Sequence, residues 1–113
     1  MFVEVFKAYT LVADFEVDDE AHAVSNYHKY TDDWLYWPFG YYDYVDYDHY
    51  MSFLEDRCPD ADAWNIKEIL SNFGLMFYSP FDIVKRTHGL MFGDYLWIRF
   101  DKEEVTYDDI RVR

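Results

Sequence analysis

The sequence is poor in the residues that cross-link small proteins or mark their turns. Its 113 residues include one cysteine, Cys58, four glycines and three prolines. A single cysteine excludes an intramolecular disulfide and is consistent with a reducing compartment. Four scattered glycines form no phosphate-cradling loop. No apolar run is long enough to span a bilayer, and the first residues lack the pattern of a signal peptide. We therefore expect a cytoplasmic protein.

Basic side chains are also scarce. Ten Lys and Arg residues face 23 Asp and Glu residues, so the net charge is -13. Such a charge disfavours contact with nucleic acid or anionic lipid and favours fast association with basic surfaces. Residues 1–63 have a charge balance of -12, and residues 64–113 have a balance of -1. We therefore expect the first half to supply an interaction surface and the second half to supply more of the scaffold.

Motifs for enzyme chemistry are missing as well. None of the serines lies in a glycine-flanked nucleophile elbow. No motif surrounds Cys58, so we expect a small, partly buried thiol rather than a nucleophile. Carboxylates are so numerous that a pair of them means little without a buried, perturbed group. The sequence therefore indicates a protein that is not an enzyme and needs no cofactor.

Possible metal ligands are present, but their spacing is not diagnostic. His22, His28, His49 and Cys58 are candidates, and His88 is a fifth residue of the right type. No pair has the short spacing of a zinc motif, so the fold would have to assemble a site. We expect isolated surface or capping histidines and no metal, with a zinc-stabilised protein as the alternative.

The most distinctive stretch is Trp34 to Tyr50, WLYWPFGYYDYVDYDHY, in which nine of seventeen residues are aromatic. Pro38 and Gly40 indicate a turn within it. Tyrosine and tryptophan dominate interface hot spots, and carboxylates between them complement a basic groove. The other interpretation buries the rings in the core and leaves the carboxylates as caps and solvated positions. The predicted partner-binding residues are Asp32, Asp33, Trp37, Tyr41, Tyr42, Asp43, Tyr44, Asp46 and Asp48.

The N-terminal segment has the composition of a strand. Phe2 to Phe15 is rich in β-branched and aromatic residues and is predicted as one strand. The acidic run Asp14 to Glu20 is predicted as a solvated loop, because adjacent carboxylates repel one another. A calcium loop would need ligand spacing and a central glycine that this run lacks. Ala21 to Tyr30 fits either a short helix or a strand.

Three helices are predicted after the aromatic stretch. The first runs from a cap at Asp46 to about Arg57. The second runs from about Ala61 to Phe73, with Asp60 or Asp62 as its cap. Its predicted apolar stripe consists of Ile66, Ile69, Leu70 and Phe73. Gly74 is predicted as the left-handed residue that ends the helix.

The third helix has the clearest end signals. Ser79 is the expected N-cap, Pro80 takes the first helical position and Asp82 follows three residues after the cap. Ile83, Val84 and Phe81 are expected to point to the core. Lys85, Arg86 and His88 fall in the last turn, where the negative dipole end favours cations, and Gly89 closes the helix. A phosphate site formed by these cations is the alternative, which the dipole disfavours.

The C-terminal segment completes the predicted fold. Asp94 to Phe100 alternates like a strand, and Asp101 to Glu104 is predicted as a charged turn. Val105 to Val112 fits a hairpin partner or a short helix capped by Thr106. Strands and helices do not alternate regularly, so a parallel winding is disfavoured. We expect a single α+β domain with a small, largely antiparallel sheet packed by about three helices.

In size, acidity and aromatic content the whole chain resembles the small acidic anti-defence proteins of phages and mobile elements, the anti-CRISPR proteins among them. The resemblance carries no diagnostic motif and no site residues. The resemblance implies a protein of the bacterial cytoplasm that inhibits an RNA-guided nuclease such as Cas9. The inhibitor would block the loading of guide RNA or target DNA into the nuclease. Carboxylates would stand in for phosphates and rings for stacked bases, as in a DNA mimic.

A second hypothesis is a regulatory or adaptor module of a mobile element without nucleic-acid mimicry. The aromatic stretch would then be a protein–protein or homodimer interface. A third is a metal-dependent enzyme or metal-stabilised binder that uses the histidines and Cys58. None of the three involves a membrane or direct contact with nucleic acid.

Overall fold

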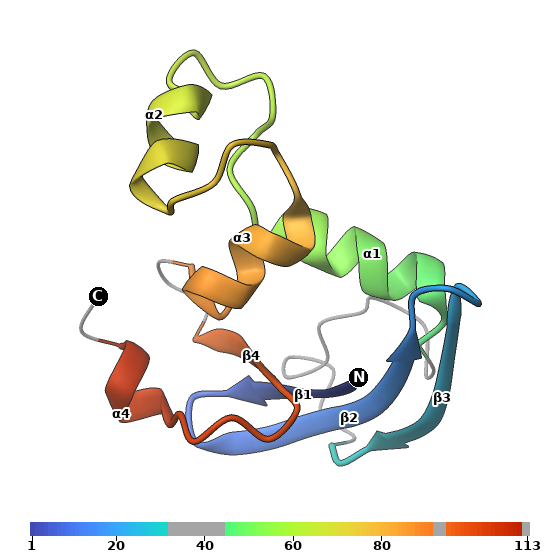
Figure 1. The fold of residues 1–113 in the computed structure, drawn as a ribbon. Helices are drawn as coiled ribbons and strands as arrows, with labels where there is room; N and C mark the ends of the chain where they lie inside the picture. Colours follow the sequence, from blue (N-terminus) through green and yellow to red (C-terminus); the bar gives the residue numbers. More distant parts are fainter. Residues whose placement is uncertain (32–44, 92–94, 112–113) are drawn as a thin grey trace.

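The chain forms a four-stranded antiparallel sheet, and the helices of residues 47–56 and 80–87 pack against one face of it (Figure 1). The computed structural model describes residues 1–31, 45–91 and 95–111. In the sheet the strand order is β3-β2-β1-β4. The expected α+β class with a small antiparallel sheet is therefore confirmed. The N-terminal strand pairs antiparallel with the strand that ends at Phe100. The elements are β1 (Phe2–Lys7), β2 (Thr10–Asp18), β3 (Ala23–Lys29), α1 (Tyr47–Asp56), α2 (Ile66–Asn72), α3 (Pro80–Thr87), β4 (Leu96–Phe100) and α4 (Tyr107–Ile110).

The first eighteen residues form a hairpin, so the prediction of one strand from Phe2 to Phe15 is wrong. β1 and β2 pair antiparallel, and Lys7 lies opposite Thr10. Ala8 takes a positive φ of 51° in the turn, which contains no glycine, asparagine or proline. Contacts from β4 hold this turn, because the Trp97 indole N–H donates to the Ala8 carbonyl at 2.8 Å. These partners are 89 residues apart, so no local signal marks the turn.

The acidic run is strand through Asp18, and the predicted loop is wrong there. Phe15 and Val17 are buried, and the carboxylates that alternate with them, Asp14 and Glu16, have partners on β3. The Asn26 amide donates to Glu16 Oε2 at 2.7 Å, and Asp14 bonds His28. Cross-strand pairing therefore outweighs repulsion between neighbouring carboxylates. The segment that fitted either a helix or a strand is β3.

The core lies between the inner face of the sheet and the helices α1 and α3. Phe15 of β2 meets Tyr50 of α1 edge to face, with ring centroids 5.8 Å apart. Phe81 of α3 meets Phe100 of β4 at 5.3 Å. Phe81 is partly buried, and the fully buried side chains of the sheet and the two helices include Val3, Val5, Leu54, Ile83, Val84 and Ile98. This packing fixes α1 against the sheet and so positions its N-terminus.

Two of the predicted helix starts are confirmed. Asp46 caps α1, because its carboxylate accepts from the His49 backbone N–H at 2.8 Å. Ser79 caps α3 by accepting from the Asp82 N–H at 3.4 Å, and Pro80 is the first helical residue. The buried residues of α1 are Tyr50, Phe53 and Leu54. Short-range capping patterns thus locate these helices correctly.

The C-terminal ends are also resolved. His88 ends α3 with its backbone in the left-handed region. Its side chain is buried, and its Nδ1 lies 3.1 Å from the carbonyl oxygen of Ile98. The imidazole is therefore not an exposed group at the C-terminal end of the helix. Gly89 follows with φ of 70°. Residues 107–110 form α4, and the Thr106–Asp109 capping box selects the short-helix alternative over the hairpin.

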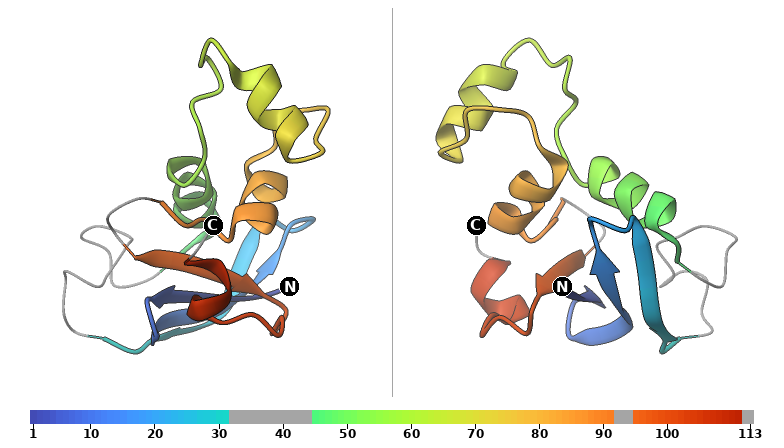
Figure 2. Two further views of the ribbon diagram at one scale, coloured as in Figure 1. Left: turned by 90° about the vertical axis from the view of Figure 1, so that its left-hand side faces the viewer. Right: turned by 45° about the vertical axis from the view of Figure 1, so that its right-hand side comes forward.

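Helix α2 is shorter than predicted and stands away from the sheet, beyond α1 and α3 (Figure 1 and Figure 2). It begins at Ile66, and its N-cap residue Asn65 makes no side-chain cap bond. Asp60 instead accepts from the Asp62 N–H within a turn. The left-handed Gly74 is confirmed, with φ of 73°. Of the predicted apolar stripe, only Leu70 is buried.

Candidate partner-binding surface

Most of the predicted partner-binding residues fall outside the described part of the chain. These are Asp32, Asp33, Trp37, Tyr41, Tyr42, Asp43 and Tyr44. The structure places the remaining two, Asp46 and Asp48, at the start of α1, and both are exposed. These two residues lie beside the β2–β3 turn, because Tyr47 between them bonds Asp19 of that turn.

An acidic corner forms where the β2–β3 turn meets the start of α1. We define it as Asp18, Asp19, Glu20, Asp46 and Asp48, all of which are exposed. The first three belong to the run that was predicted as a loop. Two segments nearly thirty residues apart thus bring five carboxylates to one end of the molecule.

One tyrosine joins the two halves of the acidic corner. The Tyr47 hydroxyl donates to Asp19 Oδ1 at 3.0 Å. The Tyr47 ring stacks on His22 with centroids 4.9 Å apart and planes 2° apart. Partial burial, and then the bond to Asp19, raise the pKa of Tyr47, so the hydroxyl stays a donor at neutral pH. Flat rings and carboxylates therefore lie side by side here.

The β2–β3 turn is held by its own first carboxylate. Asp18 Oδ1 accepts from the backbone N–H groups of Glu20 and Ala21, at 3.0 and 3.1 Å. Residues 8–28 and 45–56 contain no lysine or arginine. The corner therefore projects negative potential that no cation within its own two segments offsets.

A row of charged side chains crosses the outer face of the sheet, and sequence reasoning missed it. The Arg99 guanidinium donates two hydrogen bonds to the Glu4 carboxylate, at 2.9 and 3.1 Å. Glu4 lies opposite Asp14 in the β1–β2 register. Asp14 in turn contacts His28 Nδ1 at 2.9 Å and accepts from the Tyr30 hydroxyl at 2.8 Å.

This row serves the scaffold, because both of its buried carboxylates have partners. Glu4 and Asp14 are each 7% exposed. Groups buried in this way need bonds from neighbouring strands. Up to 95 residues separate the partners along the chain. The one sequence signal for this row is the presence of charged residues inside segments that are otherwise typical of strands.

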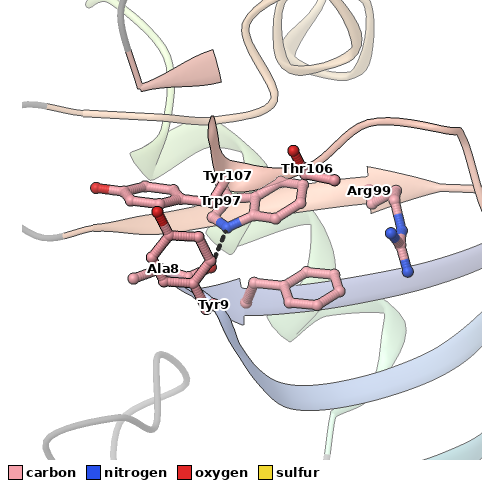
Figure 3. Close-up of a pocket in the computed structure, with 7 residues that line it drawn as sticks. Ala8, Tyr9, Trp97, Arg99, Thr106 and Tyr107 are labelled. Atoms are coloured by element: carbon pink, nitrogen blue, oxygen red, sulfur yellow. Dashed lines mark hydrogen bonds between the residues drawn. The ribbon is translucent and has the colours of Figure 1, made fainter. Parts of the chain in front are cut away.

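An aromatic cleft of about 180 Å³ opens at the β1–β2 turn (Figure 3). Phe6 and Trp97 stack at 4.5 Å, and Tyr9 meets Tyr107 edge to face at 5.1 Å. Arg99 borders the cleft, but its guanidinium is already bound to Glu4 and lies over the Phe6 ring. The remaining lining residues are Ala8 and Thr106. The cleft has room for one small apolar group and contains no nucleophile–base pair.

The candidate metal ligands are dispersed among other contacts. His22 stacks on Tyr47, His28 bonds Asp14, and His49 Nδ1 lies 3.3 Å from Asp46 Oδ1. Cys58 Sγ donates to the Leu54 carbonyl at 3.1 Å. Across residues 1–31, 45–91 and 95–111, no three His, Cys, Asp or Glu side chains are grouped to hold a metal ion.

The comparisons with known proteins add no relative. No family model, no curated protein and no solved structure matches the chain. None of the described helices has the length and apolar character to cross a membrane.

Proposed function

We propose that this protein is a small acidic inhibitor that binds a basic, nucleic-acid-handling protein in the bacterial cytoplasm. The target we favour is an RNA-guided nuclease such as Cas9, blocked at guide or target-DNA loading. The observation that carries the proposal is the acidic corner. It gathers five exposed carboxylates and a stacked His22–Tyr47 pair at one end of the fold.

The acidic corner has the two elements that a basic nucleic-acid channel recognises. Such a channel neutralises phosphates with lysine and arginine and stacks bases on side-chain rings. Exposed carboxylates present the same sign of charge, and the net charge of -13 steers the encounter over a longer range. Occupation of the channel by this surface would exclude guide or target DNA.

The experiment compares two variants that each lose three charges. The corner variant carries Asp19→Asn, Glu20→Gln and Asp48→Asn. The scattered control carries Asp82→Asn, Glu104→Gln and Asp108→Asn, three exposed carboxylates outside the corner. Both have a net charge of -10, since three of the charges in the original -13 are removed. Binding to purified Cas9 and inhibition of its guided DNA cleavage are measured at fixed ionic strength.

We expect the corner variant to bind about tenfold more weakly or worse, and the scattered control to stay within about threefold of wild type. Far-UV circular dichroism must show that both variants are folded. An equal loss of affinity in the two variants would mean that net charge alone determines binding, and it would contradict a mimic localised at the acidic corner. No inhibition by wild type would exclude Cas9 as the target and favour the adaptor hypothesis.

A further inference from the structure

Residues 59–78, here called the α2 lobe, expose large apolar side chains. Trp64 is 93% exposed, Met76 is 88% exposed and Phe77 is 79% exposed. Ile66, Ile69 and Phe73 of the α2 region are only half-buried. Single exposed apolar residues are common, but several in one segment mark an interaction surface.

The α2 lobe is a closed structural unit rather than a frayed loop. The Tyr78 hydroxyl donates to the Pro59 carbonyl at 2.7 Å and joins the two ends of the lobe. The Leu75 N–H bonds the Leu70 carbonyl, and the Gly74 N–H bonds the Ser71 carbonyl, which together end α2. Arg86 of α3 donates to the Phe73 carbonyl at 2.6 Å. The fold thus holds these apolar side chains outward.

The charges around the α2 lobe indicate what covers it. Between residues 55 and 78 the exposed cation is Lys67, and Arg86 of α3 is an exposed cation that reaches the lobe at the Phe73 carbonyl. The exposed carboxylates there are Glu55, Asp56, Asp60, Asp62 and Glu68. A second copy of the chain would bring the same excess of negative charge and be repelled. An apolar pocket rimmed by lysine and arginine fits both features.

The α2 lobe is also continuous with the acidic corner. Both lie at ends of α1, whose ten residues span about 15 Å. Asp48, Ser52 and Glu55 are exposed at i, i+4 and i+7 spacing, so one solvent face of α1 leads from the corner to the lobe. The lobe projects on the side of α1 away from the sheet (Figure 1).

We propose that the α2 lobe is the apolar anchor of the same interface, and that Trp64 and Phe77 enter an apolar, cation-rimmed pocket of the basic target. This proposal rests on the proposed function. The acidic corner supplies salt-dependent attraction, whereas the lobe supplies burial of apolar area that salt does not screen. The two contributions are therefore separable by experiment.

The test uses the full chain, expressed in bacterial cells that contain the target nuclease. In each variant, one of three positions carries the photo-crosslinking residue p-benzoylphenylalanine. Position 20 reports the corner, position 64 reports the lobe, and position 95 is a control at another exposed ring. The captured protein is then purified. Its affinity is measured for wild type, the corner variant, Trp64→Ser and Phe77→Ser over a salt series.

We expect positions 20 and 64, but not 95, to capture the same basic protein. Trp64→Ser should weaken binding at least tenfold and leave the salt slope unchanged. The lobe proposal would be overturned if position 64 captured a second copy of the chain, a different protein or nothing. It would also be overturned if Trp64→Ser and Phe77→Ser both bound the captured protein as tightly as wild type does. Wild-type affinity of the corner variant would instead overturn the proposed function.

Discussion

At the residue scale, individual hydrogen bonds between distant segments decide where charges lie. Asp19 belongs to a turn and Tyr47 to a helix, yet their bond joins the two halves of the acidic corner. Arg99 and Glu4 join β4 to β1 across 95 residues. Burial separates the two structural carboxylates, Glu4 and Asp14, from the exposed carboxylates of the acidic corner, which we propose bind the target.

The Arg99–Glu4 pair gives a prediction about stability. Arg99→Leu should lower the free energy of unfolding by about 3 kcal/mol, because it leaves the buried Glu4 carboxylate without its cation. Urea unfolding at neutral pH measures this loss. The double variant Glu4→Gln/Arg99→Leu removes the unpaired charge at position 4 and should unfold at a higher urea concentration than the single variant. Equal midpoints for the two variants would contradict this role for the pair.

Cys58 gives a prediction about pH. Burial, with a smaller effect from the Glu55 charge, raises the pKa of the Cys58 thiol to about 11. At pH 8.5 the folded protein should react with iodoacetamide roughly a hundredfold more slowly than the urea-unfolded chain, whose thiol has a pKa of about 8.5. Because the folded pKa is the higher one, the contribution of Cys58 to stability is complete below about pH 8.5 and is lost as the pH rises through about 11. Equal alkylation rates would exclude the shift.

At the element scale, helix ends follow local rules and strands follow distant partners. Asp46, Ser79 and Gly74 act where their sequence patterns indicate, because a cap needs only the next three or four residues. The β1–β2 turn at Ala8 carries no local signal and depends on Trp97. Sequence therefore predicts the helices α1 and α3 better than the hairpin.

The Ser79 cap gives a prediction at this scale. Ser79→Ala should lower the free energy of unfolding by about 1 kcal/mol, because the Asp82 N–H loses its acceptor. Ser71→Ala is the matched control, since Ser71 is exposed inside α2 and alanine favours helix. Thermal and urea unfolding of both variants measure the difference. A loss in Ser71→Ala as large as that in Ser79→Ala would argue against capping as the cause.

At the scale of the whole molecule, the acidic corner and the exposed apolar side chains of the α2 lobe lie at opposite ends of α1. The sequence correctly predicts the α+β class, and Asp46 and Asp48 of the predicted site lie in the acidic corner. It does not predict that Asp18, Asp19 and Glu20 join them, since that requires the β2–β3 turn to meet α1. Nor does it predict an exposed α2 lobe, because an apolar stripe normally indicates burial.

The salt dependence of binding tests the central claim most directly. The affinity of the wild-type protein for Cas9 is measured between about 50 and 500 mM NaCl, with circular dichroism to confirm that the fold persists. A mimic that acts through its carboxylates should lose affinity steeply and linearly in log salt, and the corner variant should show a shallower slope. An affinity that does not change over this range, or equal slopes for wild type and the corner variant, would contradict the account.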